Sequence, residues 1–137
     1  MAAQLLLFGW ISLPEVYRLK KILIVDDSVA EITLMKSVLE KAGYGSVSIS
    51  DPMRLEHTIE IERPNLILMD VVMPHRNGFQ ACRELKGRVE YAHIPVVLVT
   101  SKATPSDKFW GQQQGADGYV AKPYTPEQLL SAVKRFV

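Results

Sequence analysis

The chain of 137 residues has one cysteine, Cys82, and three histidines. A single cysteine rules out an internal disulfide, so nothing calls for an oxidising compartment and we expect a cytoplasmic protein. His57, His75 and His93 lie far apart, and with Cys82 they show none of the short spacings typical of zinc ligands. The sequence therefore argues against both a disulfide-stapled fold and a structural zinc site.

A charge excess of either sign is also missing, because 16 Lys and Arg residues are matched by 15 Asp and Glu residues, for a net charge of +1. We therefore expect no nucleic-acid surface and no polybasic membrane anchor. The apolar stretch "LLLFGWISL" at 5–13 is shorter than the about 20 residues that span a bilayer, and it has no secretory cleavage pattern. We treat residues 1–20 as an amino-terminal extension of unknown role: a docking helix, an interaction segment, or, most simply, a tag or misassigned start.

Hydrophobic residues are plentiful at 47%, which is enough for one domain with a substantial core. Short runs of β-forming residues recur and predict strands at 22–25, 47–50, 66–69, 96–100 and 119–121. The first, third and fourth runs are almost continuously aliphatic, as in strands that are buried on both faces of a parallel sheet. The strands would lie inside the domain, with helices covering both faces.

Helical signals fall between these runs. Apolar residues repeat every three or four positions at Val29, Ile32, Met35, Leu39 and Ala42, and again at Phe79, Cys82 and Leu85. Three cap-plus-proline pairs, at 51–52, 104–105 and 125–126, predict further helix starts, the first of them for a helix over 53–62. Five strands alternating with five helices predict a doubly wound α/β domain with a five-stranded parallel sheet over residues 21–137.

Polar side chains follow the carboxyl ends of four predicted strands, where sites form in open α/β sheets. They are Asp26, Asp27, Asp70, Thr100 and Lys122. Adjacent carboxylates repel, and Mg²⁺ would relieve that repulsion because it prefers oxygen ligands. Asp70 would complete the magnesium site and act as a nucleophile on a phosphoryl group, while Lys122 neutralises the charge of the phosphoryl oxygens.

Each of these residues also has a structural interpretation. Asp27 or Ser28 would cap the first helix, Asp70 would open a turn, and Thr100 would end a strand. Lys122, taken alone, would be an exposed lysine. The structural interpretation is less convincing when the five residues are considered together. It would require that each polar group came to the same edge of the sheet by an unrelated coincidence.

The motifs "LIVDDS", "LILMDVVMP", "VVLVTS" and "GYVAKP" together resemble the receiver domain of two-component response regulators, the CheY-like family. The resemblance covers residues 21–137 and implies the strand order 2-1-3-4-5. It also implies that Asp70 is the phosphoacceptor and that Asp26, Asp27 and Asp70 bind Mg²⁺ together with the backbone carbonyl of Val72.

The same resemblance assigns a switch to the other edge residues. Thr100 would supply the hydroxyl that moves toward the phosphoryl group, and Tyr119 would be the aromatic residue whose rotamer follows. Lys122 would bind the phosphoryl group, and its peptide bond to Pro123 would be cis, a geometry that proline makes accessible. Such a domain is a signalling phosphoacceptor that catalyses only its own phosphorylation and dephosphorylation, and its partners would be a histidine kinase (CheA-like or similar) and a downstream protein.

The chain ends after the last predicted helix, so we expect a single-domain regulator, a monomer or weak dimer without an output domain. The stretch at 109–130 further resembles the single-domain regulators of type IV pilus chemosensory systems, the PilG/PilH group, which points to pilus-based motility or phototaxis. We expect Phe109 and Trp110 to belong to the helix core, with a partner-binding face as the alternative. His75 and Arg76 add bulk and charge to a loop, which would alter kinase recognition.

Three other functions remain open from the residues. A dehalogenase-like phosphatase also uses a carboxylate nucleophile, but it carries a second Asp where this chain has Val72. A flavodoxin-like cofactor binder has the same topology, but Asp26 and Asp27 would repel its phosphate. A receiver that binds its partner without phosphorylation would not need the full set of polar groups.

Overall fold

A computed structural model describes residues 20–137 and contains one parallel five-stranded sheet with strand order β2-β1-β3-β4-β5. The strands are β1 Lys21–Val25, β2 Gly45–Ile49, β3 Leu66–Met69, β4 Val96–Thr100 and β5 Gly118–Ala121. The predicted doubly wound α/β fold with order 2-1-3-4-5 is therefore confirmed. The extension at 1–20 lies outside the described residues except for Lys20, which is exposed.

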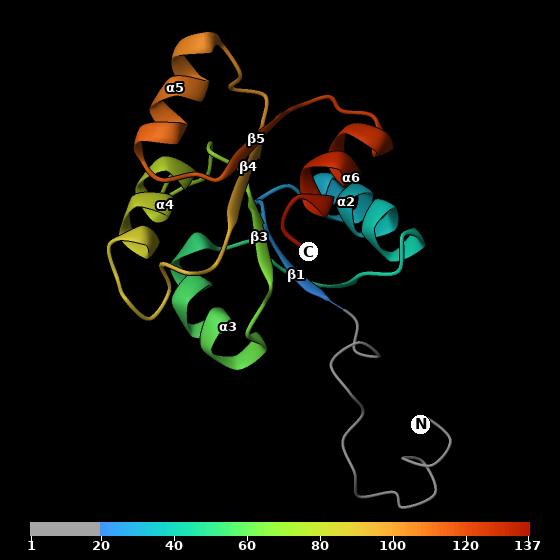
Figure 1. Ribbon diagram of the computed structural model, residues 1–137, viewed down its shortest axis with the longest axis horizontal. Coiled ribbons are helices and arrows are strands. Elements are labelled where there is room, and N and C mark those ends of the chain that lie inside the picture. The colour runs from blue at the N-terminus through green and yellow to red at the C-terminus, as the bar shows by residue number, and fades with distance from the viewer. Residues whose placement is uncertain (1–19) are drawn as a thin grey trace, which may run out of the picture.

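Helices cover both faces of the sheet (Figure 1). They are α2 Val29–Lys41, the 3₁₀ helix η2 Pro52–Arg54, α3 Leu55–Glu62, α4 Gly78–Lys86, α5 Pro105–Gln113 and α6 Pro126–Lys134. Helices α2 and α6 lie on one face, and α3, α4 and α5 lie on the other (Figure 1). None of the helices in this part of the chain has the length and apolarity that a membrane span requires.

The core has two layers because successive side chains of a strand point to opposite faces. Leu23 and Val25 of β1 pack with α3 and α4, whereas Ile22 and Ile24 pack with α2 and α6. All four side chains are fully buried. This two-sided burial explains why the central strands read as continuous apolar runs, and it fixes the direction in which their carboxyl ends point.

The helix starts are built largely as predicted. Thr125 accepts a hydrogen bond from the backbone N–H of Gln128, whose side chain in turn accepts from Thr125, and Thr104 forms a similar capping box. Asp51 caps a short 3₁₀ turn, so the regular part of the helix predicted over 53–62 begins only at Leu55. The second strand begins two residues before its predicted start, because all five residues of this edge strand are half-buried and give a weak apolar signal.

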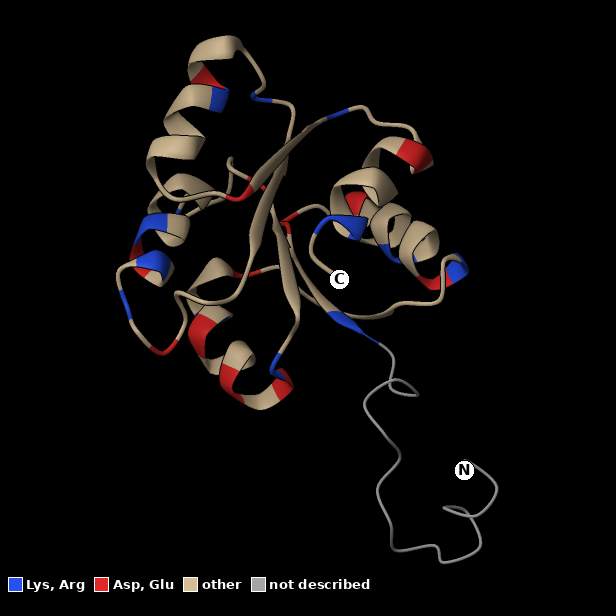
Figure 2. Ribbon diagram, in the orientation of Figure 1, with Lys and Arg blue, Asp and Glu red and all other residues tan. Residues whose placement is uncertain are grey.

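Charged residues of both signs are dispersed over the helices (Figure 2). Lys or Arg residues lie on α2, α4, α5 and α6, and α3 carries several glutamates. The blue ribbon segments of Figure 2, which mark Lys and Arg, are spread over several elements rather than gathered on one. Positive charge is therefore not concentrated on a single helix.

Arg76 departs from this surface placement, because it is only 7% exposed. Its guanidinium donates two hydrogen bonds to Glu56 of α3, at 2.8 and 2.7 Å, and one to Glu84 of α4, at 2.9 Å. A further bond reaches the backbone carbonyl of Pro52 at 3.0 Å. We call Arg76, Glu56 and Glu84 the Arg76 cluster. Of the two residues predicted to add bulk and charge to this loop, His75 is exposed, whereas the Arg76 side chain turns inward and bonds to two helices. Their effect on kinase recognition stays a prediction.

Candidate phosphoryl and metal site

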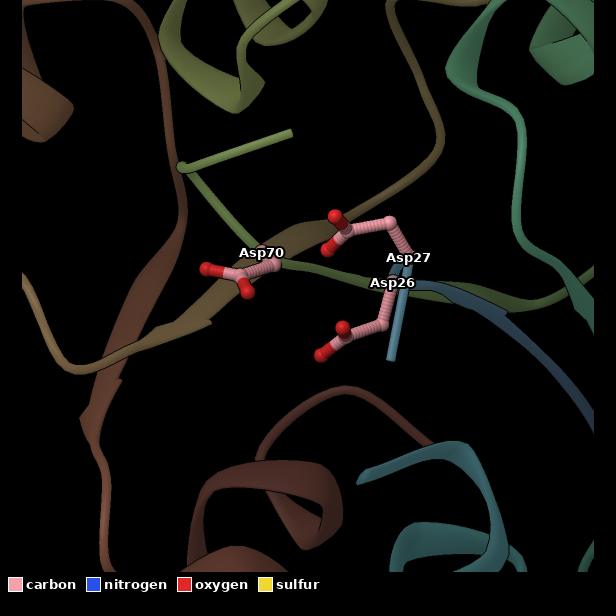
Figure 3. A group of neighbouring side chains, drawn as sticks. All are labelled: Asp26, Asp27 and Asp70. Atoms are coloured by element: carbon pink, nitrogen blue, oxygen red, sulfur yellow. The ribbon is translucent and has the colours of Figure 1, made fainter. Parts of the chain in front are cut away.

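Four neighbouring strands bring the predicted residues to one edge of the sheet. Asp26 and Asp27 follow β1, Asp70 follows β3, Thr100 ends β4 and Lys122 follows β5. Because β1, β3, β4 and β5 are consecutive in the sheet, their carboxyl ends lie next to one another. Figure 3 shows the carboxylates of the three aspartates around a shared space at this edge.

Asp26 is fully buried, and burial raises the pKa of its carboxyl against the opposing effects of hydrogen bonds from Lys122 and Ser28. Its Oδ1 accepts from the backbone N–H of Ser28 at 2.9 Å. The side chain of Ser28 in turn accepts from the backbone of Glu31, so Ser28 rather than Asp27 caps α2. Asp27 is exposed and does not cap the helix. Its carboxylate lies with those of Asp26 and Asp70.

Lys122 is the cation of the site, with a side chain that is 12% exposed. Its Nζ lies 2.7 Å from Asp26 Oδ2, 3.2 Å from Asp70 Oδ2 and 3.6 Å from Glu31 Oε2. Burial opposes its charged form, but the hydrogen bond to Asp26 and the nearby aspartate charges outweigh burial and raise the pKa of Lys122. We call Asp26, Asp70, Lys122 and Glu31 the acceptor cluster. The Lys122–Pro123 peptide bond is cis.

Glu31 was missed by the sequence reasoning. It stands three residues after Ser28, the spacing of a capping box, which predicts a role at the helix start. In the structure its carboxylate faces Lys122 instead. The sequence feature that could have indicated a role for Glu31 in the site is its place in the first turn of the helix that follows the paired aspartates.

Asp70 is held by backbone groups on one side and by Lys122 on the other. Its Oδ1 accepts from the backbone N–H groups of Val71 and Val72, at 2.6 and 3.3 Å. Gly78, the first residue of α4, lies so close that a Cβ atom there would stand 2.1 Å from the backbone oxygen of Asp70. The start of α4 therefore packs directly against the backbone of the predicted acceptor, and only glycine fits.

The three aspartates suit a hard divalent cation. One carboxylate oxygen from each of Asp26, Asp27 and Asp70 lies within 4.8 Å of the others. Carboxylate oxygens are the ligands that Mg²⁺ prefers, usually alongside water. The donor set therefore fits Mg²⁺. The side chain of Val72 is 61% exposed, and its backbone N–H bonds to Asp70.

Thr100 and Tyr119 lie on adjacent strands beside the acidic group. Thr100 is fully buried, and its hydroxyl accepts from the backbone N–H of Lys102 at 3.2 Å. The Tyr119 hydroxyl donates to the backbone carbonyl of Lys102, and burial raises the pKa of this tyrosine to about 12. Both side chains are thus bonded to the loop that follows β4. The ring of Tyr119 lies against Gly111 of α5, where a Cβ atom would approach the ring to 2.8 Å.

Phe109 and Trp110 lie on the same helix as Gly111 but point outward, with 61% and 51% of their surface exposed. The expectation that they are core residues is wrong. Gly111 is the buried residue of α5, so the inward face of the helix receives the ring of Tyr119 rather than supplying aromatic side chains of its own. The alternative, a partner-binding face, is consistent with their exposure.

Tyr124 follows Lys122 by two residues and is partly buried against the core layer under α2 and α6. Its hydroxyl is buried and, among the described residues, is the one buried side-chain N or O atom without a hydrogen-bond partner. Burial, followed by the charges of Glu31 and Asp26, raises the pKa of Tyr124 to about 12. The sequence reasoning did not single out this residue.

Comparison with known proteins agrees with this geometry. Residues 22–134 match the response regulator receiver domain family. The chain is 42% identical over 113 residues to Protein PilH of Pseudomonas aeruginosa, a match covering 82% of this chain and 93% of PilH. Among solved structures, the chemotaxis protein CheY4 of Vibrio cholerae has a TM-score of 0.81 and 29% identity, covering 88% of this chain and 100% of CheY4.

A second solved structure bears on the metal. The receiver domain of the sensor histidine kinase PA1611 from Pseudomonas aeruginosa has a TM-score of 0.78 and 27% identity, covering 87% of this chain and 98% of that domain. That structure holds a magnesium ion in its active-site cleft. With most of its length matched, this chain belongs to the family of response regulator receiver domains, the signalling phosphoacceptors of two-component systems.

Proposed function

We propose that this receiver accepts a phosphoryl group on Asp70 from a histidine kinase and works as a single-domain regulator. The observation that carries the proposal is the carboxylate of Asp70, fixed by two backbone N–H groups, with the Lys122 ammonium 3.2 Å away. A carboxylate oriented in this way is suited to attack phosphorus, and a cation beside it offsets the charge that arrives.

In the transfer step, a carboxylate oxygen of Asp70 forms a bond to phosphorus as the bond from phosphorus to the kinase histidine breaks. The electron pair of that bond stays on the imidazole nitrogen, and the product is an acyl phosphate. Lys122 is positioned to hold one phosphoryl oxygen, because its Nζ already reaches the Asp70 carboxylate. The chain need supply little beyond alignment and charge.

Asp26, Asp27 and Asp70, with the backbone carbonyl of Val72, would hold Mg²⁺. The ion, when bound, supplies positive charge against the carboxylates and the phosphoryl oxygens. The surplus of acids over Lys122 supports this assignment, since one ammonium cannot balance Asp26, Asp27, Asp70 and Glu31.

The output would pass through Thr100 and Tyr119 to the face formed by α5, β5 and α6. A phosphoryl group on Asp70 would draw Thr100 and Lys122 inward, and Tyr119 would follow, because the added negative charge biases a two-state element. Phe109 and Trp110 are exposed on α5 and would contact a downstream protein. The likeness to PilH and to pilus chemosensory regulators supports a cytoplasmic role in pilus-based motility or phototaxis.

Replacement of the acceptor tests the proposal. We expect Asp70→Asn protein to gain no phosphoryl group from acetyl phosphate and Mg²⁺, measured as the mass of the intact protein. Asp107→Asn is the matched control, because it makes the same change at an acid on α5 and should be labelled like the unmodified chain. Undiminished labelling of the Asp70→Asn variant would rule out Asp70 as the acceptor.

A further inference from the structure

The buried hydroxyl of Tyr124 has no hydrogen-bond partner among residues 20–137, although the rest of the side chain packs against the core layer under α2 and α6. A buried hydroxyl without a hydrogen bond costs free energy that a phenylalanine in the same place would avoid. Such a group is explained when it finds its partner in another state of the protein. The question is which acceptor near Tyr124 becomes available when the site is occupied.

Two acids act on this tyrosine, since the charges of Glu31 and Asp26 both contribute to its raised pKa. Asp26 is already engaged: one oxygen accepts from Ser28 and the other from Lys122. Among residues 20–137 the carboxylate of Glu31 makes no hydrogen bond and a single ion pair, a long one of 3.6 Å to Lys122 Nζ. Glu31 is therefore the acceptor with unused capacity.

Occupation of the site would release Glu31. Lys122 is shared among three carboxylates, and its distance to Asp70, 3.2 Å, is shorter than that to Glu31. The acyl phosphate on Asp70 carries close to two negative charges in place of the single charge of the carboxylate, and it draws the ammonium further in that direction. Glu31, which is 34% exposed, then loses its cation and needs another donor.

We propose that Tyr124 is a positioning residue for phosphoryl binding: its hydroxyl donates a hydrogen bond to Glu31 when Lys122 moves to the phosphoryl group. This inference rests on the proposed function of Asp70. The resting chain leaves Tyr124 unsatisfied, and the occupied chain satisfies it. Tyr124 thus favours the occupied state without contacting the phosphoryl group.

A double-mutant cycle with beryllofluoride, a phosphoryl mimic, tests the role in the full chain. Tyr124→Phe removes one oxygen atom and should weaken beryllofluoride binding in the presence of Mg²⁺ about fivefold, the effect of one net hydrogen bond. In a Glu31→Ala background the same change should have no effect on affinity. Tyr44→Phe, at a partly buried tyrosine of the same core layer, is the matched control and should leave affinity unchanged in both backgrounds.

Three results would overturn the pairing of Tyr124 with Glu31. The first is that Tyr124→Phe weakens beryllofluoride binding equally in the unmodified and Glu31→Ala chains, or in neither of them. The second is a clear fall in the urea midpoint of Tyr124→Phe without ligand, which would show that the hydroxyl already has a partner in the resting chain; the same or a higher midpoint is expected. The third is failure of the unmodified chain to bind beryllofluoride, which would refute the phosphoryl site itself and this role with it.

Discussion

The Arg76 cluster and the acceptor cluster each bury a basic side chain among acids, but they balance charge differently. Arg76 uses all three of its guanidinium nitrogens, and its hydrogen bond lowers the pKa of Glu56. In the acceptor cluster, burial raises the pKa of Asp26 even though Lys122 lies 2.7 Å away. Glu56 in the first cluster is stabilised as an anion, whereas the three carboxylates of the second cluster share the single ammonium of Lys122.

This difference is the one that we expect between a structural ion cluster and a functional one. The Arg76 cluster is satisfied within the chain and joins α3, α4 and the loop after β3. By our proposal, the acceptor cluster is completed by a group from outside the chain, a cation or a phosphoryl group. Functional sites commonly hold such locally unfavourable arrangements at some cost in stability. Three experiments test the contrast.

Breaking the Arg76 cluster should have the largest effect. Arg76→Met leaves Glu56, Glu84 and a backbone carbonyl without their donor, and breaking a buried ion pair costs about 3 kcal/mol. Urea unfolding at neutral pH measures the loss. The folded fraction should still accept a phosphoryl group on Asp70.

Arg88→Met provides the comparison, because Arg88 pairs with Glu90 on the surface. Its unfolding midpoint should stay close to that of the unmodified chain, since surface ion pairs contribute little. Similar midpoints for the Arg76→Met and Arg88→Met variants would remove the Arg76 cluster as a source of stability.

Acid should weaken the Arg76 cluster by a smaller amount. The pKa of Glu56 in the folded chain is below its ordinary value of 4.5, chiefly because Arg76 hydrogen-bonds to it. The folded chain thus binds the proton less readily than the unfolded chain, so the stabilisation is present above pH 4.5 and is lost as the pH falls through the folded value. Urea midpoints measured from neutral pH into this range should fall less steeply for Glu56→Gln. Parallel curves would show that Glu56 is not responsible.

Relieving the repulsion among the three aspartates, two of which belong to the acceptor cluster, should give the smallest effect, with the opposite sign. Asp27→Asn removes one exposed acid from the aspartate group and should stabilise the chain by about 0.5 kcal/mol in EDTA. Added Mg²⁺ should raise the melting temperature of the unmodified chain, because a ligand that binds only the folded state stabilises it, and should raise that of the variant less. An equal Mg²⁺ response in both proteins would exclude Asp27 as a ligand.

The central strands and most helix starts could be predicted because local sequence determines them. Buried parallel strands are continuous apolar runs, and cap residues such as Thr125 act within one turn. The grouping of the polar site residues at one edge of the sheet could then be predicted from the strands, because the carboxyl ends of neighbouring parallel strands lie side by side. The exact start of β2 could not be found in this way, since an edge strand with half-buried residues carries no strong pattern.

Pairings between residues that are far apart in the sequence could not be predicted from local patterns. Arg76 turns inward because Glu56, 20 residues earlier, and Glu84, 8 residues later, converge on it, and no local pattern encodes that. Phe109 and Trp110 point outward because Gly111, rather than either aromatic residue, occupies the face of α5 that packs against Tyr119, a pairing with a residue on another element. The isolation of the Tyr124 hydroxyl depends on which acceptors other donors already occupy, a property of the folded chain alone.

Gly111 gives α5 a bare patch of backbone where the ring of Tyr119 rests, and even a methyl group would approach that ring to 2.8 Å. Any larger residue at this position would displace the ring of Tyr119 even in the unphosphorylated chain. The position of the Tyr119 ring therefore depends partly on the absence of a side chain at Gly111 of α5. A designer who wished to lock the ring outward would begin by filling that space rather than by altering the tyrosine.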